Sequence, residues 1–171
     1  MIMGNIKSGL KTAELMLQGR MPGQLVIQIT DRCNATCPQC GMRKTSKFDR
    51  TRLTNDQLKE IIDAAGAKGF QAISFTGGEP MLLRKDLPEL IRHAGKAGIP
   101  YIRSGTNGFF FADHDKPGFK DKVKAIADEL ADTPLRNFWI SLDSSVPHIH
   151  EQMRGFNGVV RGMEKALPIF H

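Results

Sequence analysis

The stretch LVIQITDRCNATCPQC, residues 25–40, joins an apolar segment to the three cysteines of the chain. Its first five residues are mostly β-branched or apolar and follow Pro22 and Gly23, a pattern typical of a buried strand. Three further segments of this kind follow: Ala72–Phe75, Tyr101–Arg103 and Phe138–Leu142. The sequence therefore predicts four strands, with the cysteines directly after the first.

Segments with helical periodicity fill the intervals between these strands. One helix is expected to start at Thr54, which forms a capping box with Gln57, and to stop near Gly69. A second is expected to be capped by Asp86 and to end at Gly98. The other helical patterns cover about residues 8–18, Val123–Leu130 and Val159–Ile169.

Strands that alternate with helices indicate an α/β fold with a parallel sheet and right-handed crossovers. A complete eight-unit barrel needs roughly 250 residues, whereas this chain has 171. Four parallel strands cannot close a barrel, and the chain stops directly after a helix. We therefore expect an incomplete barrel, with the remainder removed by truncation or supplied by a second chain.

The composition argues against some classes of function. Apolar runs are only a few residues long, so no membrane span is expected. Residues 1–20 carry charges among their apolar positions and do not read as a signal peptide, which makes the cytoplasm the expected compartment. The net charge of +6 is spread along the chain without a run of five basic residues, which argues against a nucleic-acid partner.

The cysteines Cys33, Cys37 and Cys40 have the spacing CxxxCxxC, and no other cysteine occurs. A secreted disulfide framework would have an even number of cysteines spread along the chain, so these three are expected to be metal ligands. One short loop with this spacing can reach three irons of a [4Fe–4S] cubane. Ordinary [4Fe–4S] sites use four cysteines, so the fourth iron would be open to a substrate or cofactor.

Zinc is the alternative occupant of this cysteine site. Structural zinc takes four ligands, typically in two spaced pairs, and a histidine could supply the fourth. None of the histidines follows Cys40 at the short sequence separation that is typical of a zinc finger. They are His93, His114, His148, His150 and His171. The spacing thus favours iron and sulfur, while a zinc-binding interaction module stays open as an alternative function.

CxxxCxxC after the first strand resembles the signature of the radical S-adenosylmethionine (SAM) superfamily. The resemblance implies a partial (β/α) barrel of six units, of which residues 25–171 would hold four after a helical extension over residues 1–24. It also implies an oxygen-sensitive enzyme with a [4Fe–4S] cluster on Cys33, Cys37 and Cys40. In such enzymes an electron donor such as flavodoxin or ferredoxin reduces the cluster, and SAM is cleaved to a 5′-deoxyadenosyl radical that abstracts a substrate hydrogen.

The sequence TGGEP, residues 76–80, ends the second strand. Paired glycines allow a close approach of backbone, although Gly-Gly before Pro is by itself an ordinary turn. In this position it resembles the GGEP motif of the family, which implies that Gly77, Gly78, Glu79 and Pro80 bind the amino group of SAM. One departure concerns Gln39, since the family often has an aromatic residue there that contacts adenine.

Motifs after the third and fourth strands extend the resemblance. Thr106 and Asn107 lie in a turn similar to the TNG turn of many family members, which implies that they reach the cofactor; turn chemistry alone explains the pair equally well. Ser141 and Asp143 end the fourth strand and are expected on one face, either as contacts to SAM or as a solvated strand end.

Residues 150–155, HEQMRG, resemble an HxxxRG pattern in which Arg154 would bind the SAM carboxylate. The alternative is an exposed Arg154 paired with Glu151. We expect His148 and His150 to be capping or surface residues.

The aromatic residues divide into two groups. Phe75, Tyr101 and Trp139 are expected in the barrel core, whereas Phe109–Phe111 either cover the cofactor or pack beneath another domain.

The motifs resemble most the branch with SPASM/Twitch peptide-maturing enzymes and molybdenum-cofactor cyclisation enzymes. That resemblance implies peptide or cofactor maturation on a peptide or small-molecule substrate. A non-catalytic subunit or fragment that needs a second chain is the other alternative.

Overall fold

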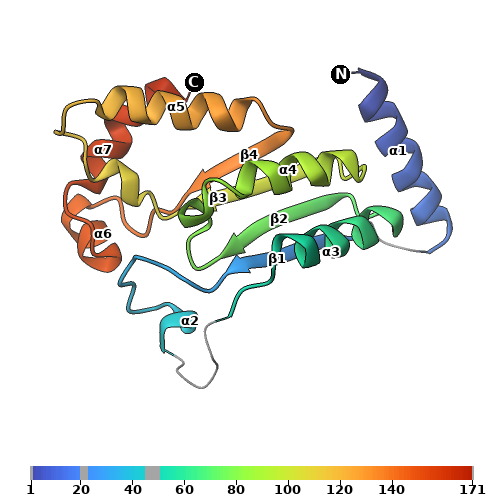
Figure 1. The fold of residues 1–171 in the computed structure, drawn as a ribbon, viewed down its shortest axis with the longest axis horizontal. Helices are drawn as coiled ribbons and strands as arrows, with labels where there is room; N and C mark the ends of the chain where they lie inside the picture. The colour runs from blue at the N-terminus through green and yellow to red at the C-terminus, as the bar shows by residue number, and fades with distance from the viewer. Residues whose placement is uncertain (1, 20–22, 45–50, 171) are drawn as a thin grey trace.

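The computed structural model describes residues 2–19, 23–44 and 51–170. Within these residues the chain forms a parallel sheet of four strands in sequential order, open at β1 and β4 (Figure 1). The strands are β1 Gln24–Thr30, β2 Ala72–Gly77, β3 Tyr101–Thr106 and β4 Leu135–Ile140. The open parallel sheet with intervening helices confirms the predicted α/β partial barrel of four units.

Helices follow each strand and cover one face of the sheet (Figure 1). The α-helices are α1 Ile2–Leu17, α2 Gly41–Lys44, α3 Asn55–Ala67, α4 Leu87–Lys96, α5 Phe119–Ala131, α6 Pro147–Arg154 and α7 Val159–Ala166. Short 3-10 helices are η1 Pro80–Leu83, η2 Phe109–Phe111 and η3 Leu167–Ile169. Among the described residues, no helix has the length and apolar character that a membrane crossing requires.

The two faces of the sheet differ in character. Residues such as Ile73, Phe75 and Ile102 are fully buried against the helices and form the core. The alternate residues point to the opposite face, which we call the inner face because a closed barrel would turn it inward. Register places one row across this inner face, made of Val26, Ser74, Arg103 and Asn137.

Local signals predicted α3 well. Thr54 accepts from the Gln57 backbone N–H at 3.2 Å, and the Gln57 side chain accepts from the Thr54 N–H at 2.9 Å. The predicted capping box is therefore confirmed, and such a cap stabilises a helix by about 1 kcal/mol. The predicted cap at Asp86 is wrong, because that carboxylate makes no capping bond and instead lies 2.6 Å from Arg52.

Some helix and strand boundaries differ from the predicted ones because pairing and packing involve residues outside the apolar segments. β4 begins at Leu135 and ends at Ile140, so it starts and stops earlier than predicted, because pairing with β3 recruits the polar residues before Phe138. α1 begins before the predicted residue 8, and α6 was not predicted. The division into an extension, residues 1–24, and a core, residues 25–171, stays a prediction.

Candidate functional site

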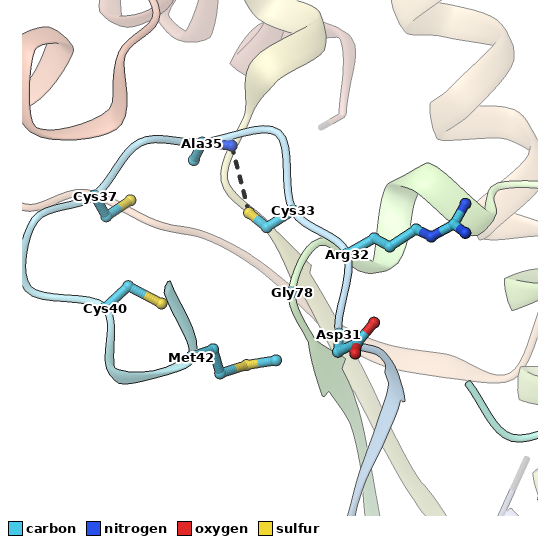
Figure 2. Close-up of a pocket in the computed structure, with 8 residues that line it drawn as sticks. All are labelled: Asp31, Arg32, Cys33, Ala35, Cys37, Cys40, Met42 and Gly78. Atoms are coloured by element: carbon cyan, nitrogen blue, oxygen red, sulfur yellow. Dashed lines mark hydrogen bonds between the residues drawn. The ribbon is translucent and has the colours of Figure 1, made fainter. Parts of the chain in front are cut away.

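The cysteine loop, residues 31–40, follows β1 at the carboxyl edge of the sheet, where ligands bind in parallel α/β folds. Cys33, Cys37 and Cys40 line a cavity of about 410 Å³ together with the side chain of Met42 and the backbone of Gly78. Figure 2 shows the three thiols around this opening. All three are free, with Cys33 exposed, Cys40 half-buried and Cys37 buried.

The arrangement of the thiols suits an iron–sulfur cluster. The three thiols come from one short loop and surround a cavity, and three sulfur donors around an open space match a cubane with one iron left for another ligand. The residues present therefore fit a [4Fe–4S] cluster.

Contacts from distant elements hold the cysteine loop. The Thr36 N–H donates to the carbonyl of Arg154 at 2.9 Å. The Asn107 amide donates to Asn34 Oδ1 at 3.0 Å and lies 3.6 Å from the sulfur of Cys33. Burial raises the pKa of the Cys37 thiol, while the nearby Arg154 guanidinium opposes that shift. Metal binding must therefore displace a proton from Cys37.

A second cavity of about 280 Å³, the strand-end cavity, shares the three cysteines and reaches the ends of β2, β3 and β4. Most of the site residues predicted from the sequence line it: Gly77, Gly78, Glu79, Pro80, Thr106, Asn107, Ser141 and Arg154. Gln39, Thr76, Gly105 and Trp139 complete its wall. Asp143 does not line it. The structure thus brings together residues that are more than 100 positions apart, while their roles stay predictions.

The paired glycines let β2 pack closely against the end of β1. Gly77 has φ +139°, and a Cβ there would clash with the carbonyl of Thr30. A Cβ on Gly78 would clash with the carbonyl of Arg32. The backbone N–H of Gly78 donates to Thr30 O at 2.7 Å, and that of Glu79 donates to Arg32 O at 2.9 Å. The close approach that glycine permits here is therefore to the start of the cysteine loop.

Glu79 is the most deeply buried carboxylate of the site, with 1% of its surface exposed. It accepts hydrogen bonds from Thr106 Oγ1 at 2.8 Å, from Asn107 N at 2.7 Å and from Met81 N at 3.0 Å. Burial raises its pKa, and these hydrogen bonds together with Arg154 oppose the shift. Both carboxylate oxygens are thus engaged by protein donors, so Glu79 joins the loop after β2 to the loop after β3.

Arg154 reaches the strand-end cavity from the end of α6. Its partner is Asp143, at 2.5 Å from Nε and 2.7 Å from Nη2, and not Glu151, whose carboxylate accepts instead from the Val160 N–H at 3.4 Å. Asp143 also accepts from Gln39 at 3.4 Å. Asp143 therefore orients Arg154, and one edge of the guanidinium is already occupied.

His150 is fully buried, which corrects the expectation of a capping or surface residue. Its Nδ1 accepts from the backbone N–H of Asp143 at 3.1 Å. Because Nδ1 is an acceptor, the neutral ring carries its proton on Nε2. His150 therefore fixes the backbone of the residue that orients Arg154.

Trp139 is the residue of the strand-end cavity that the sequence placed wrongly. It was expected in the core, yet its indole lies across Gly105, where a Cβ would clash with the ring, and it lines the cavity. Trp139 lies two residues before Ser141, and alternate residues of a strand share a face. Because Ser141 was predicted at the site, this spacing could have placed Trp139 there as well. Phe75 is buried as expected, whereas Tyr101 is 44% exposed.

The aromatic run after β3 belongs to the core. Phe110 and Phe111 are buried, and the ring of Phe111 lies 6.2 Å from that of Phe170. The side chains of Phe109–Phe111 line neither the cysteine cavity nor the strand-end cavity. The alternative that this run covers the cofactor is therefore wrong, while packing beneath another domain stays a prediction.

Comparisons with known proteins agree with this architecture. The sequence profile described as "Radical SAM superfamily" matches residues 27–169. A "Probable GTP 3',8-cyclase" of Sulfolobus acidocaldarius is 34% identical over 151 residues, covering 86% of this chain and 44% of the relative. A "GTP 3',8-cyclase" of Rhizobium etli is 31% identical over 156 residues, covering 86% of this chain and 41% of the relative. The chain therefore spans about four tenths of the length of these curated relatives.

Solved structures show the same fold at low sequence identity. Streptococcus suis SuiB bound to S-adenosylmethionine superimposes with a TM-score of 0.62 at 19% identity, over 92% of this chain and 34% of SuiB. BtrN in complex with AdoMet and 2-DOIA gives 0.57 at 20% identity, over 74% of this chain and 48% of BtrN. The profile match covers most of the chain and includes the three cysteines and the strand-end motifs. This chain belongs to the radical SAM superfamily, a class of enzymes that use a [4Fe–4S] cluster and SAM.

Proposed function

We propose that this chain carries the centre at which SAM is reductively cleaved, in an enzyme that acts on a small molecule in cofactor biosynthesis. The observation that supports this most is the strand-end cavity, which places residues from the ends of β2, β3 and β4 beside the three free thiols of the loop after β1. When bound, the cluster supplies the electron that splits SAM into methionine and a 5′-deoxyadenosyl radical, which then takes a hydrogen atom from the substrate.

The residues of the chain have distinct tasks in this proposal. Cys33, Cys37 and Cys40 hold the cluster, and the backbone of residues 77–79 binds the SAM ammonium. The Nη1 side of Arg154, which lies 3.7 Å from the Cys37 sulfur, attracts the SAM carboxylate, because the opposite edge of the guanidinium is held by Asp143.

Three polar residues and the indole complete the cavity in this proposal. Thr106 and Asn107 line the cavity and hold Glu79 and the cysteine loop in place, Ser141 offers a hydroxyl group, and Trp139 forms an apolar wall.

The choice of a small molecule follows from the relatives. Two curated relatives at 34% and 31% identity are named for cyclisation of GTP, which favours cofactor biosynthesis over peptide maturation. SuiB has also been solved with its precursor peptide, but its 19% identity relates to the fold alone. A nucleotide such as GTP is therefore the first substrate to test.

The experiment is anaerobic reconstitution with iron and sulfide, reduction with dithionite, and detection of 5′-deoxyadenosine by mass spectrometry after SAM is added. We expect 5′-deoxyadenosine from the unaltered chain and from Gly41→Ala, a neighbour of Cys40 with open space around its Cα. Cys37→Ala should form none. An intact cluster without 5′-deoxyadenosine would support a non-catalytic fragment and contradict the proposal. Parallel samples with GTP test the substrate by its consumption.

A further inference from the structure

Arg103, on β3, has no carboxylate partner among the described residues, unlike several other arginines of the chain. Four of them pair with carboxylates: Arg52 with Asp86, Arg84 with Glu129, Arg92 with Asp132 and Arg154 with Asp143. Arg103 pairs with no carboxylate among the described residues, and its Nε is buried without an acceptor there. A buried donor of this kind calls for a partner, because buried polar groups are nearly always hydrogen-bonded.

The surroundings of Arg103 on the inner face are neutral. Its own row across the sheet contains Val26, Ser74 and Asn137. The next row toward the strand ends contains two printed pairs, Gln28 with Thr76 and Gly105 with Trp139. Neither row contains a carboxylate. The guanidinium charge is therefore not balanced by the side chains of these two rows, and an anion could approach it from the inner face.

Trp139 connects Arg103 to the strand-end cavity. The central guanidinium carbon of Arg103 lies 4.7 Å from the centroid of the indole ring, within the range of a cation–π contact. The same indole lines the strand-end cavity beside Gly105 and Ser141. Stacking on the ring holds the guanidinium in place but provides no acceptor for the N–H groups in its plane. These groups remain available for a ligand next to the cavity.

We propose that Arg103 and Trp139 form an oxyanion-binding subsite, which holds a phosphate or carboxylate group of the substrate. A planar guanidinium presents two parallel N–H donors that match both of these groups. The subsite lies one row deeper in the sheet than the strand-end cavity, so the remainder of such a substrate would extend toward the cysteine loop. The proposal rests on the proposed function only for the statement that the bound anion belongs to the substrate.

Trp139 provides the measurement, because it is the only tryptophan of the chain. The chain without cluster is titrated separately with pyrophosphate and with citrate while tryptophan fluorescence is recorded, with sodium chloride at matched ionic strength as a control. We expect a saturable change with at least one of the two probes. Pyrophosphate alone would assign a phosphate group and citrate alone a carboxylate group, while a response to both still supports an oxyanion site.

Two substitutions test the role of Arg103 in that response. Arg103→Gln should weaken probe binding at least about tenfold, and Arg103→Lys, which keeps the charge but loses the two-point geometry, should also weaken it. The control is Arg136→Gln, which removes an exposed arginine of β4 that lines a different cavity with α5 residues. Circular dichroism verifies the fold, and Arg103→Lys carries the test if Arg103→Gln does not fold.

Two results would overturn the subsite. One is the absence of a saturable change with either probe in the unaltered chain. The other is equal binding in the unaltered chain and in Arg103→Lys and Arg103→Gln. Neither result involves the cluster or SAM, so failure of the subsite is distinguishable from failure of SAM cleavage.

Discussion

The carboxylate of Asp143 binds the guanidinium of Arg154 at two points, with Oδ2 at 2.5 Å from Nε and Oδ1 at 2.7 Å from Nη2. Both side chains are largely covered, with 15% of Arg154 and 20% of Asp143 exposed. Because this edge is occupied, Nη1 lies on the side of Cys37, 3.7 Å from its sulfur. Asp143 thus sets the direction in which Arg154 presents its charge to the cysteine loop.

Replacing Asp143 with Asn tests this orientation. An amide offers a single acceptor oxygen, and its NH₂ group would face an N–H of Arg154, so the two-point contact cannot form. We expect the affinity of the cluster-loaded chain for SAM to fall about tenfold, measured by equilibrium dialysis. Asp128→Asn, which removes an exposed partner of Lys124 on α5, should leave the affinity unchanged. Equal affinities in both variants would mean that other contacts position Arg154.

Glu79→Gln should destabilise the chain. Glu79 receives three hydrogen bonds in a buried site, and an amide placed there sets an N–H group against at least one protein donor. The expected loss is about 1–3 kcal/mol in the free energy of unfolding, measured with urea. Glu89→Gln, at an exposed pair with Lys59, should change it by less than about 1 kcal/mol. A loss no greater than that of the control would show that the buried carboxylate does not join the two loops.

Gly78→Ala should impair loading of the cluster. The added methyl group would clash with the carbonyl of Arg32 and push the end of β2 away from the cysteine loop. We expect less iron and sulfide per chain after reconstitution than in Gly41→Ala, where nothing lies within reach of the added Cβ. Equal iron and sulfide in the two variants would contradict the importance of this close approach.

His150 predicts a dependence of stability on pH. Burial lowers the pKa of its imidazole below the ordinary value of about 6.5, with Arg154 acting in the same direction and Asp143 and Glu151 opposing it. Between about pH 7.5 and 5.5 the unfolded chain therefore gains a proton on this residue before the folded chain does. This residue thus makes the free energy of unfolding fall as the pH is lowered, by up to about 1.4 kcal/mol per pH unit.

Urea titrations across this pH range provide the measurement. In His150→Asn the amide oxygen can replace Nδ1 as acceptor for the Asp143 N–H, but the side chain does not titrate. We expect this variant to lose the contribution of His150 to the slope, whereas His148→Asn, on the exposed side of α6, keeps it. A slope unchanged in His150→Asn would exclude His150 as its source.

Signals that reside in neighbouring residues were predictable from the sequence. The spacing of Cys33, Cys37 and Cys40, the glycine pair of β2 and the capping box at Thr54 each depend on a few consecutive positions. Their chemistry is local, so a single sequence contains it. The order of these motifs also indicated that the ends of successive strands meet at one edge of the sheet.

Features set by tertiary contacts were not predictable in the same way. Asp86 does not cap α4 because Arg52, 34 residues earlier, takes its carboxylate. β4 includes Leu135 and Asn137 because they pair with residues of β3. A pattern of apolar residues along one segment carries no information about such pairing. The burial of His150 and the place of Trp139 depend on how α6 and β4 pack. Strand alternation alone does not tell which face of an open sheet lines a cavity.

The central claim is that Cys33, Cys37 and Cys40 hold a [4Fe–4S] cluster with one iron open to SAM. The most direct measurement is electron paramagnetic resonance of the reconstituted, dithionite-reduced chain with and without SAM, alongside metal analysis. We predict about four irons and four sulfides per chain, a reduced-cluster signal that changes when SAM is added, and no such signal in Cys37→Ala. Bound zinc in place of iron, or a cluster signal indifferent to SAM, would contradict the account.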